Sequence, residues 1–164
     1  MMATMDQEYI RVLIADDDEY VLDAYRDAFT EPESTREMRA LDMLSAELFD
    51  PDTAPQSEPK FKVVACNQGQ DAISAAQAAS ADGKPFDVVI LDVRMPPGID
   101  GVEAGSQIRQ MDPDVEIVFV TGFSDVPLEE LRRRVPPPMK VHYFSKPLSF
   151  AQLAQDVAHM VREH

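Results

Sequence analysis

Short apolar runs alternate with longer amphipathic stretches along most of the chain. The runs are rich in Val, Ile and Leu, and an unbroken apolar run of this length is typical of a parallel strand buried on both faces. The pattern predicts strands over 9–15, 62–66, 86–91, 116–120 and 141–144.

Amphipathic stretches follow these runs and predict helices. After the first run, apolar residues recur with helical spacing at Val21, Leu22, Tyr25, Ala28 and Phe29. Further helices are expected over 71–81, after Asp100 as a capping residue, and over about 126–134. The last helix begins with a capping box, Ser149 with Gln152, and runs nearly to the end of the sequence.

Strand and helix thus alternate five times, which predicts an α/β protein with a doubly wound parallel sheet and helices on both faces. Ligands of such sheets bind beyond the carboxyl ends of the strands. We therefore expect the functional residues to lie at that edge.

The stretch 31–59 interrupts the alternation, because it exceeds the roughly 12–15 residues of an ordinary long loop. Ser34 and Glu37 form a possible capping box ahead of an apolar stripe at Met38, Leu41, Leu44 and Leu48. The stripe predicts an inserted helix that packs on the domain or on a second copy in a homodimer. We expect a tail over 1–8 and a single domain over 9–164, with 31–59 inserted between the first helix and the second strand.

Composition and charge argue against several classes of protein. With 164 residues and 45% hydrophobic content, the chain is sufficient for about one globular domain. No run approaches the roughly eighteen apolar residues of a membrane span, and the first ten residues lack the pattern of a signal peptide. The single Cys66 fits the reducing cytoplasm. A formal net charge of -15 repels nucleic-acid phosphates, so direct DNA binding is not expected.

Polar side chains follow four of the predicted strands at the points where they end. These residues are Asp16 and Asp17, Asp92, Thr121 and Lys146. Crowded carboxylates repel one another, which favours a divalent cation such as Mg²⁺ that takes oxygen ligands and leaves room for a phosphoryl group. Because a lysine and a hydroxyl stabilise phosphoryl charge, Asp92 is interpreted as a nucleophile that forms an acyl phosphate.

Four blocks of sequence resemble the receiver domain of two-component response regulators, namely Arg11–Asp17, Asp87–Pro96, Val118–Gly122 and Tyr143–Pro147. The resemblance covers nearly the whole chain and implies a flavodoxin-like sheet of strand order 2-1-3-4-5. It implies a signalling domain rather than an enzyme with a separate substrate. A phosphoryl group would come from the phosphohistidine of a sensor histidine kinase or a phosphotransfer protein, and a downstream effector would read the result.

The resemblance also implies roles for the acidic residues. Asp92 is the phosphoacceptor, and it ligates Mg²⁺ together with Asp17 and the backbone carbonyl of Arg94. Asp16 binds the ion through a water molecule. The loop after Asp92 reads Met-Pro-Pro-Gly-Ile-Asp-Gly, one residue longer than is usual in receivers, so the metal side of the site is expected to differ in shape.

Further roles follow for the remaining matched positions. Thr121 and Lys146 contact the phosphoryl group, and Thr121 with Tyr143 forms the switch that changes the surface of the helix over 126–134, the fifth strand and the last helix. Arg94 and Phe123 occupy positions that tune the lifetime of the phosphoryl group. Since both side chains are bulky enough to obstruct an attacking water, we expect slow loss of phosphate.

Two alternatives remain open on the sequence alone. Asp16-x-Asp18 after the first strand superficially matches the haloacid-dehalogenase phosphatases, although the paired carboxylates that this family needs after its lysine are missing. The extra loop residue also leaves room for an interaction module that keeps the receiver fold without phosphorylation.

Overall fold

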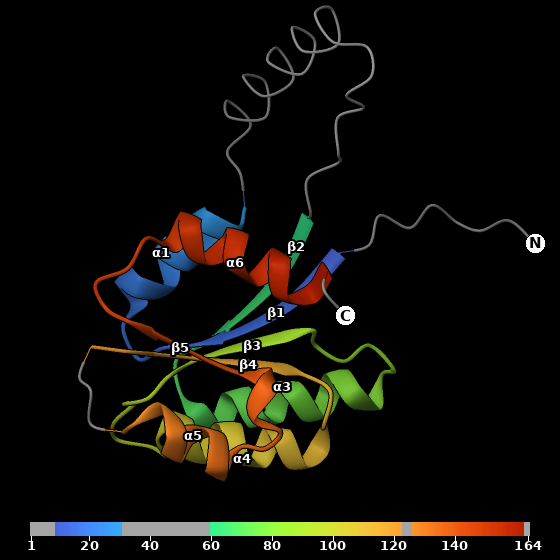
Figure 1. Cartoon of the computed structure of the whole chain (residues 1–164). Coiled ribbons are helices and arrows are strands. Elements are labelled where there is room, and N and C mark those ends of the chain that lie inside the picture. Colours follow the sequence, from blue (N-terminus) through green and yellow to red (C-terminus); the bar gives the residue numbers. More distant parts are fainter. Residues whose placement is uncertain (1–8, 31–59, 123–125, 163–164) are drawn as a thin grey trace, which may run out of the picture.

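A five-stranded parallel sheet in the order β2-β1-β3-β4-β5 forms the centre of the computed structural model (Figure 1). The structure describes residues 9–30, 60–122 and 126–162, so the expected tail over 1–8 and the expected helical insertion over 31–59 lie outside the described residues. The strands are β1 Tyr9–Ala15, β2 Lys60–Cys66, β3 Val88–Asp92, β4 Glu116–Thr121 and β5 Val141–Ser145. This strand order confirms the predicted flavodoxin-like α/β class.

Helices cover both faces of the sheet (Figure 1). Helices α1 (Glu19–Phe29) and α6 (Phe150–Arg162) lie on one face. The other face carries α3 (Gly69–Ala81), α4 (Gly101–Met111) and α5 (Leu128–Arg134). A short 3-10 turn, η1 (Pro138–Lys140), leads into β5.

The strand side chains divide the core into two apolar layers. Along β1, Val12 and Ile14 pack with α1 and α6, whereas Leu13 packs with the helices on the opposite face, as the two-residue period of a strand requires. All three are fully buried. Burying a side chain of this size contributes roughly 1.5–3 kcal/mol, so both layers stabilise the sheet.

The predicted helix starts are largely confirmed. Asp100 caps α4 by accepting a hydrogen bond from the Glu103 amide at 2.8 Å. The Ser149 hydroxyl accepts from the Gln152 amide at 3.2 Å, but the Gln152 side chain donates to Asp156 instead of closing the capping box. The third strand begins two residues later than expected, at Val88.

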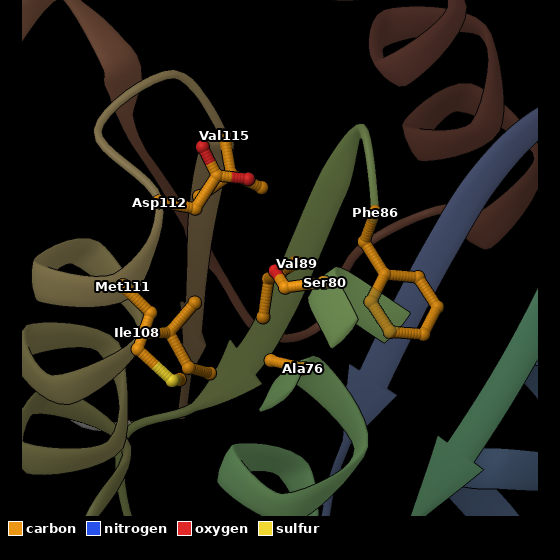
Figure 2. A pocket seen from close by; sticks show the side chains of 8 residues that line it. All are labelled: Ala76, Ser80, Phe86, Val89, Ile108, Met111, Asp112 and Val115. Carbon is orange, nitrogen blue, oxygen red and sulfur yellow. The ribbon is translucent and has the colours of Figure 1, made fainter. Parts of the chain in front are cut away.

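A small apolar pocket lies between α3, α4 and the amino-terminal ends of β3 and β4 (Figure 2). Ala76, Val89, Ile108 and Val115 contribute to its lining, and its volume is about 10 Å³, enough for about one water molecule. A substrate does not fit there. The pocket also lies near the edge of the sheet where the strands begin, away from Asp92.

Candidate functional site

The carboxyl ends of β1 and β3 bring three aspartates together. One carboxylate oxygen from each of Asp16, Asp17 and Asp92 lies within 4.8 Å of the others. Asp16 and Asp92 are 1% and 8% exposed, while Asp17 is open to solvent. The cause is the parallel pairing of β1 with β3, because neighbouring parallel strands end at the same edge. The three carboxylates thus form an acidic hollow, in which Asp16 and Asp92 are buried and Asp17 faces the solvent.

Lys146 completes this hollow from the end of β5. Its Nζ donates to Asp16 Oδ2 at 3.1 Å and to Asp92 Oδ2 at 3.4 Å. Although burial acts to lower the pKa of Lys146, the hydrogen bonds and negative charges of the two aspartates raise it overall. The lysine therefore stays positively charged between the two buried carboxylates.

Burial changes the titration of both buried aspartates. It raises the pKa of Asp92 to about 6, with a further contribution from the negative charge of Asp16. Burial likewise raises the pKa of Asp16, and the charge of Asp17 acts in the same direction. One lysine does not compensate three carboxylates, so the hollow has the charge and the oxygen donors that suit a divalent cation.

The turn from β1 into α1 explains why neighbouring aspartates have different roles. Asp16 Oδ1 accepts a hydrogen bond from the Asp18 amide at 2.9 Å, which fixes the Asp16 carboxylate inside the hollow. Asp18 in turn caps α1 by accepting from the Tyr20 amide at 2.9 Å. Asp18 therefore caps α1, and the acidic cluster is formed by Asp16, Asp17 and Asp92 instead.

The remaining candidate residues that the structure describes lie on β4, on β5 and just after β3. Thr121 ends β4 and is buried, and its carbonyl accepts a hydrogen bond from the Lys146 amide at 2.8 Å. Tyr143 is half-buried on β5 and packs against the core layer of α3, α4 and α5. Arg94 is exposed, and its amide donates to Asp92 Oδ1 at 3.3 Å. The lifetime position Phe123 lies outside the described residues.

Two features of the site were missed in the sequence. A Cβ at Gly101 would overlap the carbonyl of Asp92, so only glycine lets α4 begin this close to the phosphoacceptor strand. Gln68, which follows β2, reaches the loop after Asp92 and donates to the Pro96 carbonyl at 3.4 Å. The position of Gln68 in the sequence could have indicated this, because Gln68 follows a predicted strand that ends at the same edge of the sheet as the aspartates.

Within the described residues, none of the helices has both the length and the apolar character needed to cross a bilayer.

Comparison with known proteins agrees with this geometry. The family model described as the response regulator receiver domain matches residues 54–158. The match begins just before β2, so β1, with Asp16 and Asp17 after it, precedes the matched residues in the sequence. In the sheet, however, β1 lies between the matched strands β2 and β3.

Curated relatives include regulators and kinases. The response regulator receiver protein CpdR of Brucella abortus (strain 2308) is 31% identical over 78 residues, which are 48% of this chain and 62% of that protein. The tetrathionate response regulatory protein TtrR of Salmonella typhimurium (strain LT2) is 32% identical over 120 residues, or 68% of this chain and 53% of that protein. The chain matches 10% of the length of the sensor kinase CckA of Brucella abortus. It therefore spans only part of the curated relatives that it matches.

Solved structures share the fold. A response regulator receiver protein from Sinorhizobium medicae WSM419 superposes with a TM-score of 0.63 at 22% identity, and the match covers 94% of this chain and 96% of that one. The response regulator domain of Thermotoga maritima CheB gives a TM-score of 0.60, also at 22% identity, over 95% and 96% of the two chains. With the family model matching well over half of its residues, this chain belongs to the response regulator receiver domain family of two-component systems.

Proposed function

We propose that this chain accepts a phosphoryl group on Asp92 from the phosphohistidine of a sensor histidine kinase or a phosphotransfer protein. We assign this function to a single domain over 9–164 acting in the cytoplasm, where the lone Cys66 would stay reduced. The observation that carries the proposal is the position of Asp92, which is buried beside Asp16 and within 3.4 Å of the Lys146 amine.

The acidic hollow fits Mg²⁺. Asp17 and Asp92 would hold the ion directly with the backbone carbonyl of Arg94, and Asp16 would hold it through water. When bound, the ion supplies positive charge that keeps Asp92 ionised and offsets the charge of the incoming phosphoryl oxygens. The raised pKa of Asp92, about 6 without an ion, supports this assignment because it reflects uncompensated negative charge as well as burial.

In the transfer step, an Asp92 carboxylate oxygen attacks the phosphorus of the phosphohistidine. A P–O bond forms as the P–N bond breaks, and the electron pair of the P–N bond stays on the imidazole nitrogen. Lys146 and the Thr121 hydroxyl would contact the phosphoryl oxygens as charge develops on them. These are the three residues to which we assign catalysis, and the reaction modifies the protein itself.

We propose that the new charge is read at the surface of α5, β5 and α6. Phosphorylation adds roughly −1.5 to −2 charges at one point, which favours contacts between Thr121 and the phosphoryl group. Thr121 and Ser145 are register partners of β4 and β5, so a shift of Thr121 acts close to Tyr143 on β5. A downstream effector protein or domain would bind the altered surface.

We also propose that the phosphoryl group is lost slowly, because Arg94 and Phe123 are both large enough to obstruct an in-line water. Replacing both with alanine should shorten the half-life of phosphorylated Asp92. An unchanged half-life would contradict this role.

The direct test is incubation with Mg²⁺ and acetyl phosphate followed by intact-mass measurement. The wild-type chain should gain one phosphoryl group, and Asp92→Asn should gain none. Asp27→Asn is the matched control, since Asp27 is exposed on α1 and should leave the gain unchanged. A wild-type chain that gains no mass would overturn the proposal and favour an interaction module that works without phosphorylation.

A further inference from the structure

The loop between β3 and α4, residues 93–100, is fixed at both ends. At its start, the Arg94 amide donates to Asp92 Oδ1, and the Met95 side chain is 1% exposed within the core. At its end, the Gly101 amide donates to the Val93 carbonyl at 2.8 Å. The residues between, Pro96 to Gly98, are exposed and need another support if the loop is to keep one shape.

That support comes from the residue that precedes α3. The side-chain amide of Gln68 donates to the Pro96 carbonyl at 3.4 Å. A Cβ built on Gly98 would lie only 2.6 Å from Gln68 Oε1, so the loop backbone passes directly against the Gln68 amide. The next residue, Gly69, is also close to the loop, because a Cβ there would lie 3.0 Å from Ile99 Cγ1.

We infer that Gln68 is a positioning residue for the metal side of the site. The inference rests on the proposed function, in which the Arg94 carbonyl is a ligand of Mg²⁺. Gln68 contacts the loop two residues beyond Arg94, and the Arg94 amide is bonded to the Asp92 carboxylate. Holding the Pro96 carbonyl therefore limits how far the Arg94 carbonyl and the Asp92 side chain move apart.

Two single substitutions remove this contact in different ways. Gln68→Ala deletes the donor. Gly98→Ala keeps the donor but places a methyl group where the flexible Gln68 amide lies, so the amide must move away. Because the same contact is lost in both, the double variant should be no worse than Gln68→Ala alone. Gln70→Ala is the matched control, as Gln70 lies two residues further along, is exposed on α3 and carries the same side chain.

The decisive measurement is the Mg²⁺ affinity of each variant by calorimetric titration. Losing one hydrogen bond of ordinary strength should weaken Mg²⁺ binding about three- to tenfold in Gln68→Ala and in Gly98→Ala, with Gln70→Ala like the wild type. Amide hydrogen exchange over 94–99 should be faster in both variants. The melting temperature and exchange in the other elements should stay close to those of the wild type, which separates positioning from a general loss of structure.

Unchanged Mg²⁺ affinity in Gln68→Ala would overturn the inference, as would a double variant whose loss equals the product of the single losses. A wild-type chain that fails to bind Mg²⁺ would overturn it too. By contrast, a wild-type chain that binds Mg²⁺ but accepts no phosphoryl group would contradict the proposed function alone, and the affinities of the variants would still decide the role of Gln68.

Discussion

At the scale of single residues, the site is defined by how little of its negative charge is compensated. Lys146 forms ion pairs with Asp16 and Asp92, two of the three clustered aspartates. Asp16 and Asp92 consequently have raised pKa values, with burial as the main cause. A positive charge close to these aspartates therefore stabilises their ionised forms.

Lys146→Met should slow phosphorylation of Asp92 by acetyl phosphate about hundredfold, the usual cost of removing a charge-stabilising donor from a transition state. Losing the lysine charge should also raise the pKa of Asp92 further, since Lys146 acts to lower it. The rate is measured from the time course of the intact-mass gain. Lys84→Met, at an exposed position after α3, should react at the wild-type rate, and an equally fast Lys146→Met would refute the assignment.

Asp92 should also make the stability of the metal-free protein depend on pH. Its pKa rises from 3.8 to about 6 on folding, so between these values the native state binds more protons than the unfolded state. Stability must then fall as pH increases from about 4 to 6. Asp92→Asn lacks this titration and should be more stable than the wild type by about 1–3 kcal/mol at pH 7, with little difference at pH 4.

Urea unfolding in the presence of a chelator, at several pH values, measures this difference. Addition of Mg²⁺ at pH 7 should stabilise the wild type and reduce the gap, since the ion binds the native state. A gap that is the same at pH 4 and pH 7 would show that Asp92 is not the titrating group.

At the scale of elements, the clustered aspartates, Thr121 and Lys146 lie where a strand ends or just after it. The β1–α1 turn assigns consecutive aspartates to different tasks, as Asp16 faces Lys146 while Asp18 caps α1. The β3–α4 connection is similarly constrained by Asp100 at the helix start and by Gly101 against the Asp92 carbonyl. Substitutions that are adjacent in sequence should therefore separate stability from chemistry.

Asp18→Ala should lower the free energy of unfolding by about 1 kcal/mol, the typical effect of losing an N-cap side chain, and should leave the phosphorylation of Asp92 intact. Chemical denaturation and intact-mass measurement check the two parts. Asp17→Ala is the contrasting variant, because it should reduce Mg²⁺-dependent phosphorylation without removing a helix cap. If Asp18→Ala abolished phosphorylation in a folded protein, Asp18 would have to be counted among the reacting groups.

At the scale of the whole molecule, the fold was largely predictable because its parts obey local rules. The apolar run Val12–Ala15 identifies β1 as a buried strand, and the apolar stripe of α1 identifies a helix packed on the sheet. The alternation of strands with helices then predicts a parallel sheet. The convergence of Asp16, Asp92 and Lys146 followed from parallel strands ending at one edge. Gln68 escaped prediction because its role depends on how a loop distant in sequence folds against it, which no local periodicity encodes.

Phosphorylation should change the outer surface as well as the site. In the phosphorylated wild type, amide hydrogen exchange should change in α5 and β5, because Thr121 is joined to the start of the β5–α6 connection through Lys146. Thr121→Ala should accept phosphate more slowly than the wild type and, once phosphorylated, should show a smaller change in exchange over 128–145. The two proteins are compared by mass spectrometry with and without acetyl phosphate, and identical changes in both would argue against Thr121 as the switch.

Helix α1 ends at Phe29 and β2 begins at Lys60, and both points lie at the edge of the sheet where the strands begin (Figure 1). Tyr9 and Lys60 are register partners at this edge, a full strand length from the aspartates. A reporter or a binding module grafted between α1 and β2 should therefore leave the phosphoacceptor site at the opposite edge undisturbed.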